Sequence, residues 1–532
     1  MAKRLVGIFA RKSVEQMHAE HEHGELKRSL NATNLVLLGI GCIIGTGIFV
    51  LTGRAAAQYA GPAIMISFVI TGTLCALVAL SYAELASTIP VSGSAYSYSY
   101  ASMGEIVAWI MGVLLVLEYG LSAATVAVGW SGYVASFLHD IGLDIPPALL
   151  GAPGTPISDF ASGAQVGVGV VNLPAVIGVA AVTGLLVLGV SESAFVNNVV
   201  VAIKLAVVVA FIAIGAFYVH PELWSPLVPA AQPPPPPGAS TGLLAEIGAA
   251  LWAVVTAADT GRYGIPGIIT AAATIFFAYI GFEAVSTAGA ESRNPSKDMP
   301  IGILGSLVIC TILYILTSAV LVGIVPYTDL NDAAPIAKAV NQIGLPWFAI
   351  LVKIGAIAGL SSVMLVLLYG QTRIFYTMAR DGLIPPAFAS VHKSFRTPWI
   401  NTLVVGVIAC GFAGFKGLDF LANLTNVGTL FAFAIVCMTV VYLRFARPEV
   451  ARPFKTPLFP VTPVLGAVMC LFLLMSLMAH EDTRNFFLIY LAAGIVLYFL
   501  YSMWNSKLGK GIVVLGHEDV DVAQAPSPRI PD

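Results

Sequence analysis

Long apolar runs are the feature that most restricts how this chain can fold. About twelve of them follow one another along the 532 residues, and a helix needs about 20 residues to cross a bilayer, so each is about long enough or longer. Open strands would leave backbone groups unpaired in lipid, and a β-barrel would show short alternating segments instead, so the runs predict helices. They lie roughly at 34–53, 62–88, 104–137, 171–190, 194–219, 266–290, 300–325, 345–372, 398–415, 421–443, 460–479 and 485–504. The sequence therefore predicts an all-α polytopic membrane protein with about 12 transmembrane helices.

The composition supports this class and argues against others. Hydrophobic residues make up 58% of the chain and charged residues 10%, whereas soluble proteins carry about 25% charged residues. The net charge of −2 gives no basic surface, so the expected surroundings are a lipid bilayer and no nucleic acid. The six cysteines show no disulfide framework or CxxC spacing, so neither disulfides nor a metal site is expected.

The distribution of lysine and arginine predicts the orientation. With the N-terminus inside, 19 of these residues fall in cytoplasmic stretches and five in outer loops, while Lys204 and Lys353 lie within apolar runs. The positive-inside rule then places both termini in the cytoplasm. No cleavable signal peptide precedes the first run, so that run is expected to act as its own insertion signal.

The order of the runs predicts two groups of five helices followed by two more. The expected segments are a cytoplasmic N-terminal segment (1–30), a first repeat of helices 1–5 (31–220), an extracellular proline-rich loop (221–265), a second repeat of helices 6–10 (266–445), helices 11–12 (446–505) and a cytoplasmic tail (506–532). The stretch 138–170 and the run Pro233–Pro237 are expected in surface loops. The tail after Trp504 is expected to be disordered.

Two runs contain residues that interrupt a regular helix. The first reads LLGIGCIIGTGIFVLTG, and the sixth reads IFFAYIGFEAVSTAGAESRNP with Gly281 and Glu283 in its middle. Glycines also let membrane helices pack closely, and Gly41 to Gly45 is a GxxxG pair, so close packing alone is an alternative. Because the two runs are the first of each group of five, however, matching broken helices and a binding site between them are favoured.

A broken helix in an apolar environment has a chemical use. Unwinding frees amide N–H groups and carbonyls, and each costs several kcal/mol if it stays without a partner. A zwitterion satisfies both sets, because its carboxylate accepts from helix N-terminal amides and its ammonium donates to carbonyls. Such a site would bind the part that all α-amino acids share.

Three motifs together resemble a known family. GIGCIIGTGIFVLTG, FFAYIGFEAVSTAGAESRNPSKDMPIGI and YGQTRIFYTMARDGLIP are similar to the amino acid–polyamine–organocation transporter superfamily, and most similar to its bacterial cationic-amino-acid-transporter-type branch. The resemblance covers about Leu30 to Trp504. It implies a LeuT-like fold with a 5+5 inverted repeat, two peripheral helices, and helices 1 and 6 unwound at mid-membrane. It also implies a multi-pass protein of the bacterial inner membrane.

The resemblance implies substrate-binding residues in both broken helices. In helix 1 it implies that the amides of Gly45, Thr46 and Gly47 bind the substrate carboxylate and that the Ile43 carbonyl accepts from the substrate amine. In helix 6 it implies that carbonyls accept from the amine and that one ring, that of Phe277, closes over the substrate. These helix 6 residues are Phe277, Ala278 and Ile280. A packed or lipid-facing aromatic is the alternative for the Phe277 ring.

Lys204 is the second break in the membrane pattern. It lies about ten residues into the run VNNVVVAIKLAVVVAFIAIG, where a central lysine costs about 2.5–3.5 kcal/mol to insert. A lysine that pairs with an acid or extends to the interface is one interpretation. The resemblance implies another, in which Lys204 replaces a coupling cation, bonds carbonyls near Gly39 to Gly41 and Ser361 or Ser362, and exchanges a proton. The proton is then the coupling ion, and no other cofactor is expected.

The buried acids leave more alternatives open. Glu118 either joins a polar network with Lys204 or substrate and takes part in proton coupling, or forms a structural hydrogen bond to a neighbouring helix. Glu283 is a candidate for contacting the substrate or gating its path. Lys353 has no role that the resemblance supplies, and Glu84 near a cytoplasmic end is expected to be structural.

The expected function is secondary active transport of amino acids with proton-driven uptake, and not catalysis. The sequence contains no HExxH, GxSxG or P-loop pattern. For the cluster of His18, His21 and His23, a solvated tail is favoured over metal binding. An amino acid or polyamine exchanger and a membrane amino-acid sensor are the alternatives. Broad or neutral specificity is favoured over arginine or lysine, and a small membrane accessory subunit stays open.

Overall fold

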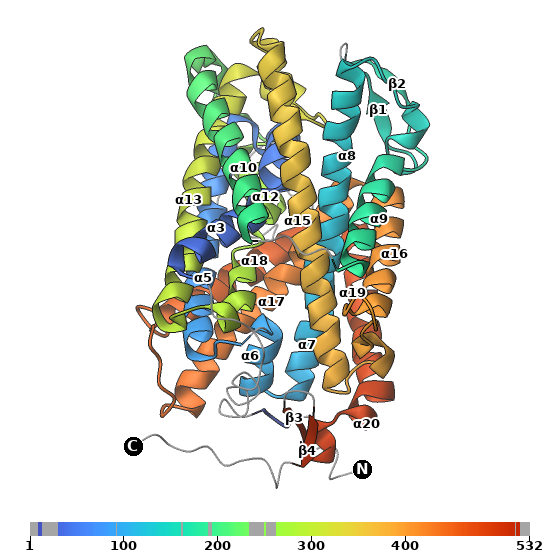
Figure 1. Ribbon diagram of the computed structural model, residues 1–532. Coiled ribbons are helices and arrows are strands. Elements are labelled where there is room, and N and C mark those ends of the chain that lie inside the picture. Colours follow the sequence, from blue (N-terminus) through green and yellow to red (C-terminus); the bar gives the residue numbers. More distant parts are fainter. Residues whose placement is uncertain are drawn as a thin grey trace.

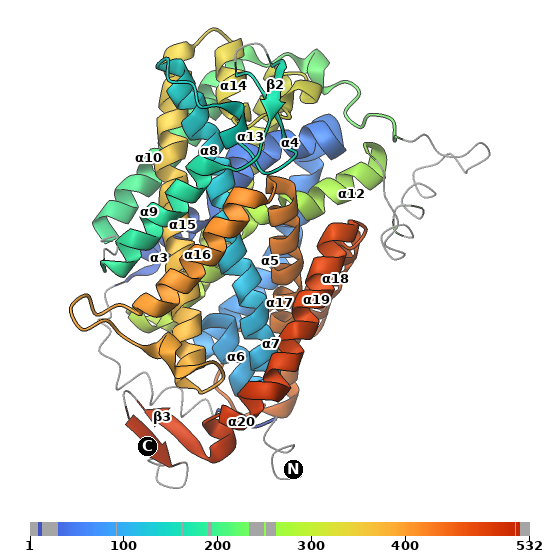
Figure 2. The same ribbon diagram turned by 90° about the vertical axis from the view of Figure 1, so that its right-hand side faces the viewer.

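The computed structural model confirms a chain built almost entirely of helices (Figures 1 and 2). It describes residues 9–12, 30–91, 93–160, 163–189, 194–232, 262–515 and 518–521, together with Ala249 and Leu251. The expected N-terminal segment lies outside the described residues except for 9–12 and Leu30, as does the histidine cluster. Pro233–Pro237 and the end of the tail are also outside them.

Each of the twelve expected runs contains an apolar helix. In the first half these are α3 (Ala32–Ile43), α5 (Ile64–Thr88), α7 (Glu105–Leu115) continuing through the π-helix η4 (Val116–Leu121) into α8 (Ser122–Asp140), α9 (Leu173–Val187) and α10 (Ala194–Gly215). In the second half they are α12 (Gly264–Ile275), α13 (Pro295–Ile324), α15 (Pro346–Arg380), α16 (Trp399–Phe415), α17 (Leu418–Ala446), α18 (Val461–Leu477) and α19 (Glu481–Leu497). Among the described residues, eight helical stretches are long and apolar enough to cross a membrane, and α3, α9, α16 and α18 are shorter.

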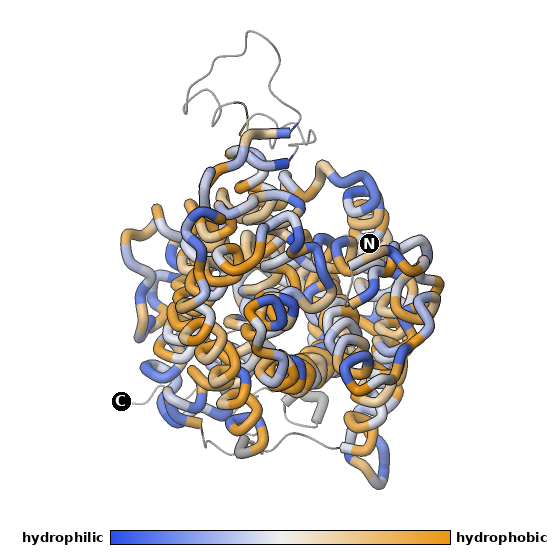
Figure 3. The backbone as a smooth tube through the Cα atoms, turned by 90° about the horizontal axis from the view of Figure 1, so that it is seen from above, coloured by the Kyte–Doolittle hydropathy of each residue, from blue (hydrophilic) through white to orange (hydrophobic). Residues whose placement is uncertain are grey.

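Burial separates central helices from peripheral ones. In the stretch Gly264–Gly289, which contains α12, 89% of the most apolar window is buried, whereas in Glu481–Asn505, which contains α19, only 22% is buried. The helices α3 and α5 both pack against α13, and α8 packs against α15 (Figure 1). Apolar residues recur along the helices on all sides of the bundle (Figure 3), as expected where lipid replaces water.

The first broken helix lies early in the chain. The helix α3 ends at Ile43, and Ile44 has an extended backbone with φ −72° and ψ 95°. A π-helix, η1 (Gly47–Leu51), then resumes the winding and leads through α4 (Thr52–Ala55) and η2 (Ala56–Ala60). The predicted interruption in helix 1 is therefore present.

The second broken helix is α12. It passes into the 3₁₀ turn η8 (Phe276–Tyr279), is interrupted at Gly281, whose φ is +124°, and continues as the 3₁₀ segment η9 (Glu283–Glu291). Only glycine adopts this φ readily, and a Cβ on Gly281 would also lie 2.8 Å from the backbone carbon of Cys42. The glycine thus lets the two broken helices touch.

The remaining elements lie at the two ends of the bundle. One end carries α14 (Pro335–Gln342) and the hairpin of β1 (Pro156–Ser158) and β2 (Gln165–Val168) within the expected loop 138–170. The other carries α6 (Ser94–Ser102), α20 (Met503–Asn505) and the hairpin of β3 (Ile512–Leu515) and β4 (Glu518–Asp521) (Figure 2). The expectation of a disordered tail is wrong for this part, because backbone pairing orders both strands, with Val513 opposite Val520.

Glu84 at the end of α5 has the structural role expected of it. Its carboxylate accepts from Arg444 Nε at 2.9 Å and from Thr456 N at 2.7 Å, and it is 2% exposed. The ion pair joins α5 to the end of α17.

We expect Glu84→Ala to lower the free energy of unfolding by about 3–5 kcal/mol, since it leaves the Arg444 guanidinium without its buried partner. The control is Glu449→Ala, which removes an exposed contact of 3.7 Å to Arg447 and should cost about 0–1 kcal/mol. Thermal unfolding of the purified protein in detergent measures both. Equal unfolding midpoints for the two variants would contradict this role.

Candidate functional site

A small cavity lies where the two broken helices meet. Its volume is about 10 Å³, which is about the space that one water molecule needs, so the cavity has no room for a larger solute. Helix 1 contributes Cys42, Ile43, Gly45, Thr46 and Gly47, helix 6 contributes Phe277 and Ile280, α8 contributes Ser122 and Val126, and α15 contributes Val363 and Leu367. Six of the seven predicted substrate residues thus come together, and their binding role stays a prediction.

Ala278 is the predicted substrate residue that does not line the cavity. It packs instead against Gly47, where a Cβ would overlap with the Ala278 backbone. This contact brings the two breaks into direct apposition. Its carbonyl oxygen accepts from the Tyr314 hydroxyl at 2.8 Å.

Tyr314 is a polar residue that the sequence analysis missed. Its hydroxyl on α13 lies 2.7 Å from the Ile43 carbonyl oxygen as well as near the Ala278 carbonyl, so it bridges both breaks. A carbonyl oxygen has two lone pairs, so Ile43 keeps one for another donor. A tyrosine inside an apolar run was the available signal, because a buried hydroxyl needs a partner.

Two hydroxyls at the cavity have no partner of their own. Thr46 Oγ1 and Ser122 Oγ are buried and have no hydrogen-bond partner among the described residues. Most buried polar atoms are hydrogen-bonded, so two orphaned hydroxyls at one cavity favour a polar ligand there. Val126, Val363 and Leu367 make the rest of the wall apolar. These three apolar residues could not be singled out from the sequence, because apolar residues that face lipid have the same composition.

Lys204 lies beside the break in helix 1, as predicted. Its ammonium is fully buried and donates to the Gly41 carbonyl at 2.7 Å and the Ile44 carbonyl at 3.3 Å. Its aliphatic chain crosses Gly359 on α15, where a Cβ would lie 2.8 Å from Lys204 Cγ. An ammonium thus satisfies carbonyls that the end of α3 leaves free.

The two serines expected beside Lys204 have other surroundings in the structure. Ser361 accepts from Trp130 Nε1 at 2.9 Å and donates to the Ile357 carbonyl at 2.8 Å. Ser362 Oγ has no hydrogen-bond partner in the described part of the chain. The expectation for Ser362 is therefore wrong, because helix rotation decides which side chain faces the ammonium.

Glu118 and Glu283 lie next to each other, and neither is exposed by more than 1%. Glu283 Oε2 accepts from the Gly281 amide at 2.8 Å, at the break in helix 6. Neither Glu118 oxygen accepts a hydrogen bond from a described residue, so the expected structural bond to a neighbouring helix is not what holds it.

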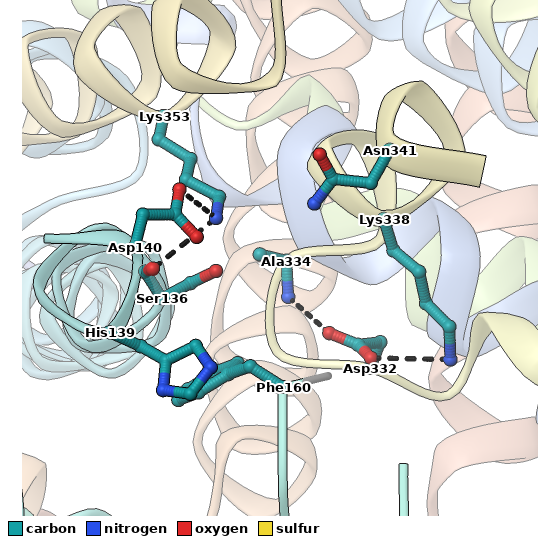
Figure 4. Close-up of a pocket in the computed structure, with 9 residues that line it drawn as sticks. All are labelled: Ser136, His139, Asp140, Phe160, Asp332, Ala334, Lys338, Asn341 and Lys353. Carbon is teal, nitrogen blue, oxygen red and sulfur yellow. Dashed lines mark hydrogen bonds and ion pairs between the residues drawn. The ribbon is translucent and has the colours of Figure 1, made fainter. Parts of the chain in front are cut away.

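A larger cavity of about 140 Å³ lies at the end of the bundle that carries α14 (Figure 4). Lys353, for which the sequence suggested no role, is buried there and lies 2.6 Å from Asp140. Lys338 lies 3.3 Å from Asp332 on another wall, and the His139 ring lies tilted at 5.7 Å from the Phe160 ring. These charges already have partners, whereas the small cavity has orphaned hydroxyls, so volume alone does not identify the candidate site.

Two broken helices that meet at a cavity with orphaned hydroxyls, inside an apolar bundle, indicate a membrane transporter. Comparison with known proteins identifies the group: residues 30–500 match the family model described as amino acid permease, so the chain belongs to that family. This confirms the resemblance to the amino acid–polyamine–organocation superfamily and its cationic-amino-acid-transporter branch.

Individual relatives are similar over most of the chain. A methylthioribose transporter of Bacillus subtilis is 44% identical over 95% of this chain and all of its own length. A branched-chain amino acid permease of the same species is 43% identical over 94% of this chain and 99% of its own. A vacuolar cationic amino acid transporter 4 of Arabidopsis thaliana is 36% identical over 83% of this chain and 68% of its own.

The family and the helices together place the protein in a functional class. It is a multi-pass membrane protein of a permease family, and its relatives support transport of amino acids or related solutes. Its bacterial relatives support a place in the bacterial plasma membrane.

We expect Gly47→Ala to lower the unfolding midpoint and the yield of folded protein, because the added Cβ overlaps with Ala278 and separates the two breaks. Gly184→Ala on α9 is the control: its Cβ would meet nothing within 4 Å, and alanine favours a helix by about 0.5–1 kcal/mol. Thermal unfolding in detergent compares the two. A Gly47→Ala protein as stable as wild type would mean that the breaks do not need this contact.

Proposed function

We propose that the protein takes up amino acids across the bacterial plasma membrane by proton-coupled alternating access. The observation that carries this proposal is the pairing of the broken helices with the fully buried ammonium of Lys204, which donates to the Gly41 carbonyl of α3. Twelve spans arranged as a 5+5 inverted repeat plus two peripheral helices, with both termini in the cytoplasm, complete the proposed architecture.

The carboxylate and ammonium of the solute would bind the backbone of the two breaks. The amides of Gly45 to Gly47 would bind the carboxylate. The free lone pair of the Ile43 carbonyl and the carbonyls of Phe277 and Ile280 would accept from the ammonium. Because the cavity has room for about one water, the Phe277 ring and its neighbours must move before a solute enters.

The walls of the cavity favour a small neutral side chain. Val126, Val363 and Leu367 are apolar, and no described carboxylate lines this cavity to pair with a guanidinium or a second ammonium. A 44% identical relative is named a methylthioribose transporter, so this uncharged sugar is a second candidate solute.

Lys204 is the proposed coupling residue. Burial disfavours its charged form, whereas the carbonyls of Gly41 and Ile44 favour it, so a movement of helix 1 that breaks these bonds would release the proton. Closure at the other end of the bundle is supported by a buried ion pair of 2.7 Å between Lys12 and Asp381, which also accepts from Tyr96 at 2.8 Å. Opening that end requires this network to separate.

We expect liposomes that contain the protein to accumulate solute when the outside is made acidic. With one proton per solute, one unit of pH difference drives about tenfold accumulation, since one pH unit equals about 1.36 kcal/mol. Neutral amino acids, arginine, lysine and methylthioribose would each be tested as labelled solutes. Uptake only into liposomes preloaded with solute would indicate an exchanger, and binding without accumulation would indicate a sensor.

We expect Lys204→Met to abolish accumulation driven by the pH difference while solute binding is retained, because methionine keeps the volume but carries no proton. The matched control is the double variant Lys353→Met, Asp140→Asn, which removes another buried lysine together with its partner. Flux and binding in the same liposomes measure both. Undiminished accumulation by Lys204→Met would refute its coupling role.

A further inference from the structure

Two carboxyl groups close to the candidate site have no part in the binding of solute derived above. We propose that Glu118 and Glu283 share one proton and form a second proton-binding site, which exchanges this proton with water as the break in helix 6 moves. The part of this inference that concerns transport rests on the proposed proton coupling, whereas the shared proton does not.

The geometry of the pair requires a proton. Glu118 is 0% exposed and Glu283 1%, and the two side chains lie within hydrogen-bonding reach of each other. Glu118 Oε1 and Oε2 and Glu283 Oε1 have no donor among the described residues; the Gly281 amide is the donor to Glu283 Oε2. Three orphaned acceptors in one place are rare in folded proteins.

The surroundings offer no described cation to compensate the charge. The titratable neighbours are Tyr82 and Cys75 on α5 and Tyr119 on η4, with Tyr98 of α6 and Cys42 of α3 facing Tyr119. All five are neutral at pH 7 in their ordinary forms. Both hydroxyls nearest the pair, those of Tyr82 and Tyr119, also have no partner among the described residues.

Two further helices pack against η4 without adding a charge there. Gln371 of α15 lies beside Gly120, and Gly428 of α17 lies beside Leu117. These two contacts therefore place no charged side chain against η4.

Elementary electrostatics then decides the protonation state. An ionised carboxylate is costly to bury without a partner, and two adjacent carboxylates cannot both ionise in a low-dielectric site. One proton between them forms a charge-assisted O–H···O⁻ hydrogen bond, which provides a donor where none exists. The pair with one proton is thus the state that fits this closed structure.

The position of the pair connects this proton to the solute cavity. Glu283 holds the Gly281 amide at the break in helix 6, directly after the cavity residue Ile280. Glu118 lies in the π-helix η4 and precedes the cavity residue Ser122 by four residues, about one helical turn. Movement of either wall changes the distance between the carboxyls. The pair and Lys204 then bind the one transported proton in turn, so the proposed ratio of one proton per solute is unchanged.

Infrared spectroscopy of the purified protein tests the shared proton directly. At pH 7 wild type should show a carboxylic-acid C=O band that changes when solute is added, and Glu118→Gln and Glu283→Gln should each lose it. Glu105→Gln is the matched control, because Glu105 is a buried carboxyl on the same span that already accepts from Tyr100 at 2.9 Å, Tyr498 at 3.0 Å and Ser506. It should retain the solute-sensitive band. No such band in wild type, or a band that survives in both glutamine variants, overturns the inference.

Transport in liposomes tests the coupling. Glutamine resembles a protonated glutamate that cannot release its proton, so both variants should keep solute exchange at equal pH and lose the about tenfold accumulation driven by one pH unit. Exchange without accumulation supports the inference, and wild-type accumulation by both variants overturns it. If wild type itself fails to accumulate solute, the proposed proton coupling is wrong, and the infrared band alone then decides whether the pair holds a proton.

Discussion

Each backbone amide and carbonyl that leaves a helix inside this bundle needs another partner, because the apolar surroundings supply none. The rest of the structure follows from that constraint at two places, Ile43–Gly47 and Phe276–Phe282. The Tyr314 hydroxyl shares its one hydrogen between a carbonyl of each break, and Lys204 donates to two carbonyls of the first. The polar side chains buried around the breaks therefore supply the hydrogen-bond partners that the interrupted helices lack.

The same contacts explain why the breaks can act together. Gly47 and Ala278 touch through their backbones, and Gly281 approaches Cys42 so closely that no side chain fits between them. A helix that moved alone would leave a carbonyl or an ammonium without a partner. A concerted movement, in which each freed group finds another partner, avoids this cost, and in the proposed transport cycle it would couple solute binding to the buried titratable groups.

The two cavities show why chemistry locates the site better than volume does. The cavity of about 140 Å³ is lined by charges that already have partners, such as Lys353 with Asp140. The cavity of about 10 Å³ is lined by two orphaned hydroxyls and lies beside both breaks. It is small because the Phe277 ring and residues of α8 and α15 pack closely around it.

Most of the helices, both breaks and the buried lysine were predictable from sequence, because hydropathy, glycine and an isolated charge act locally along the chain. The partners of these groups were not predictable, because they depend on how helices distant in sequence rotate against each other. Examples are the Tyr314 hydroxyl between the two breaks, Glu118 beside Glu283, and Ser362, which does not bond Lys204. The β3–β4 hairpin was missed because the apolar strand IVVL is short and its pairing with a second strand is not visible in composition. Sequence by itself determined where the chain is helical and where the helices break. Both follow from local features: long apolar runs must satisfy their backbone groups within a helix, and glycines interrupt two of these runs. Only the tertiary structure decided which groups satisfy the breaks, since that depends on packing between segments.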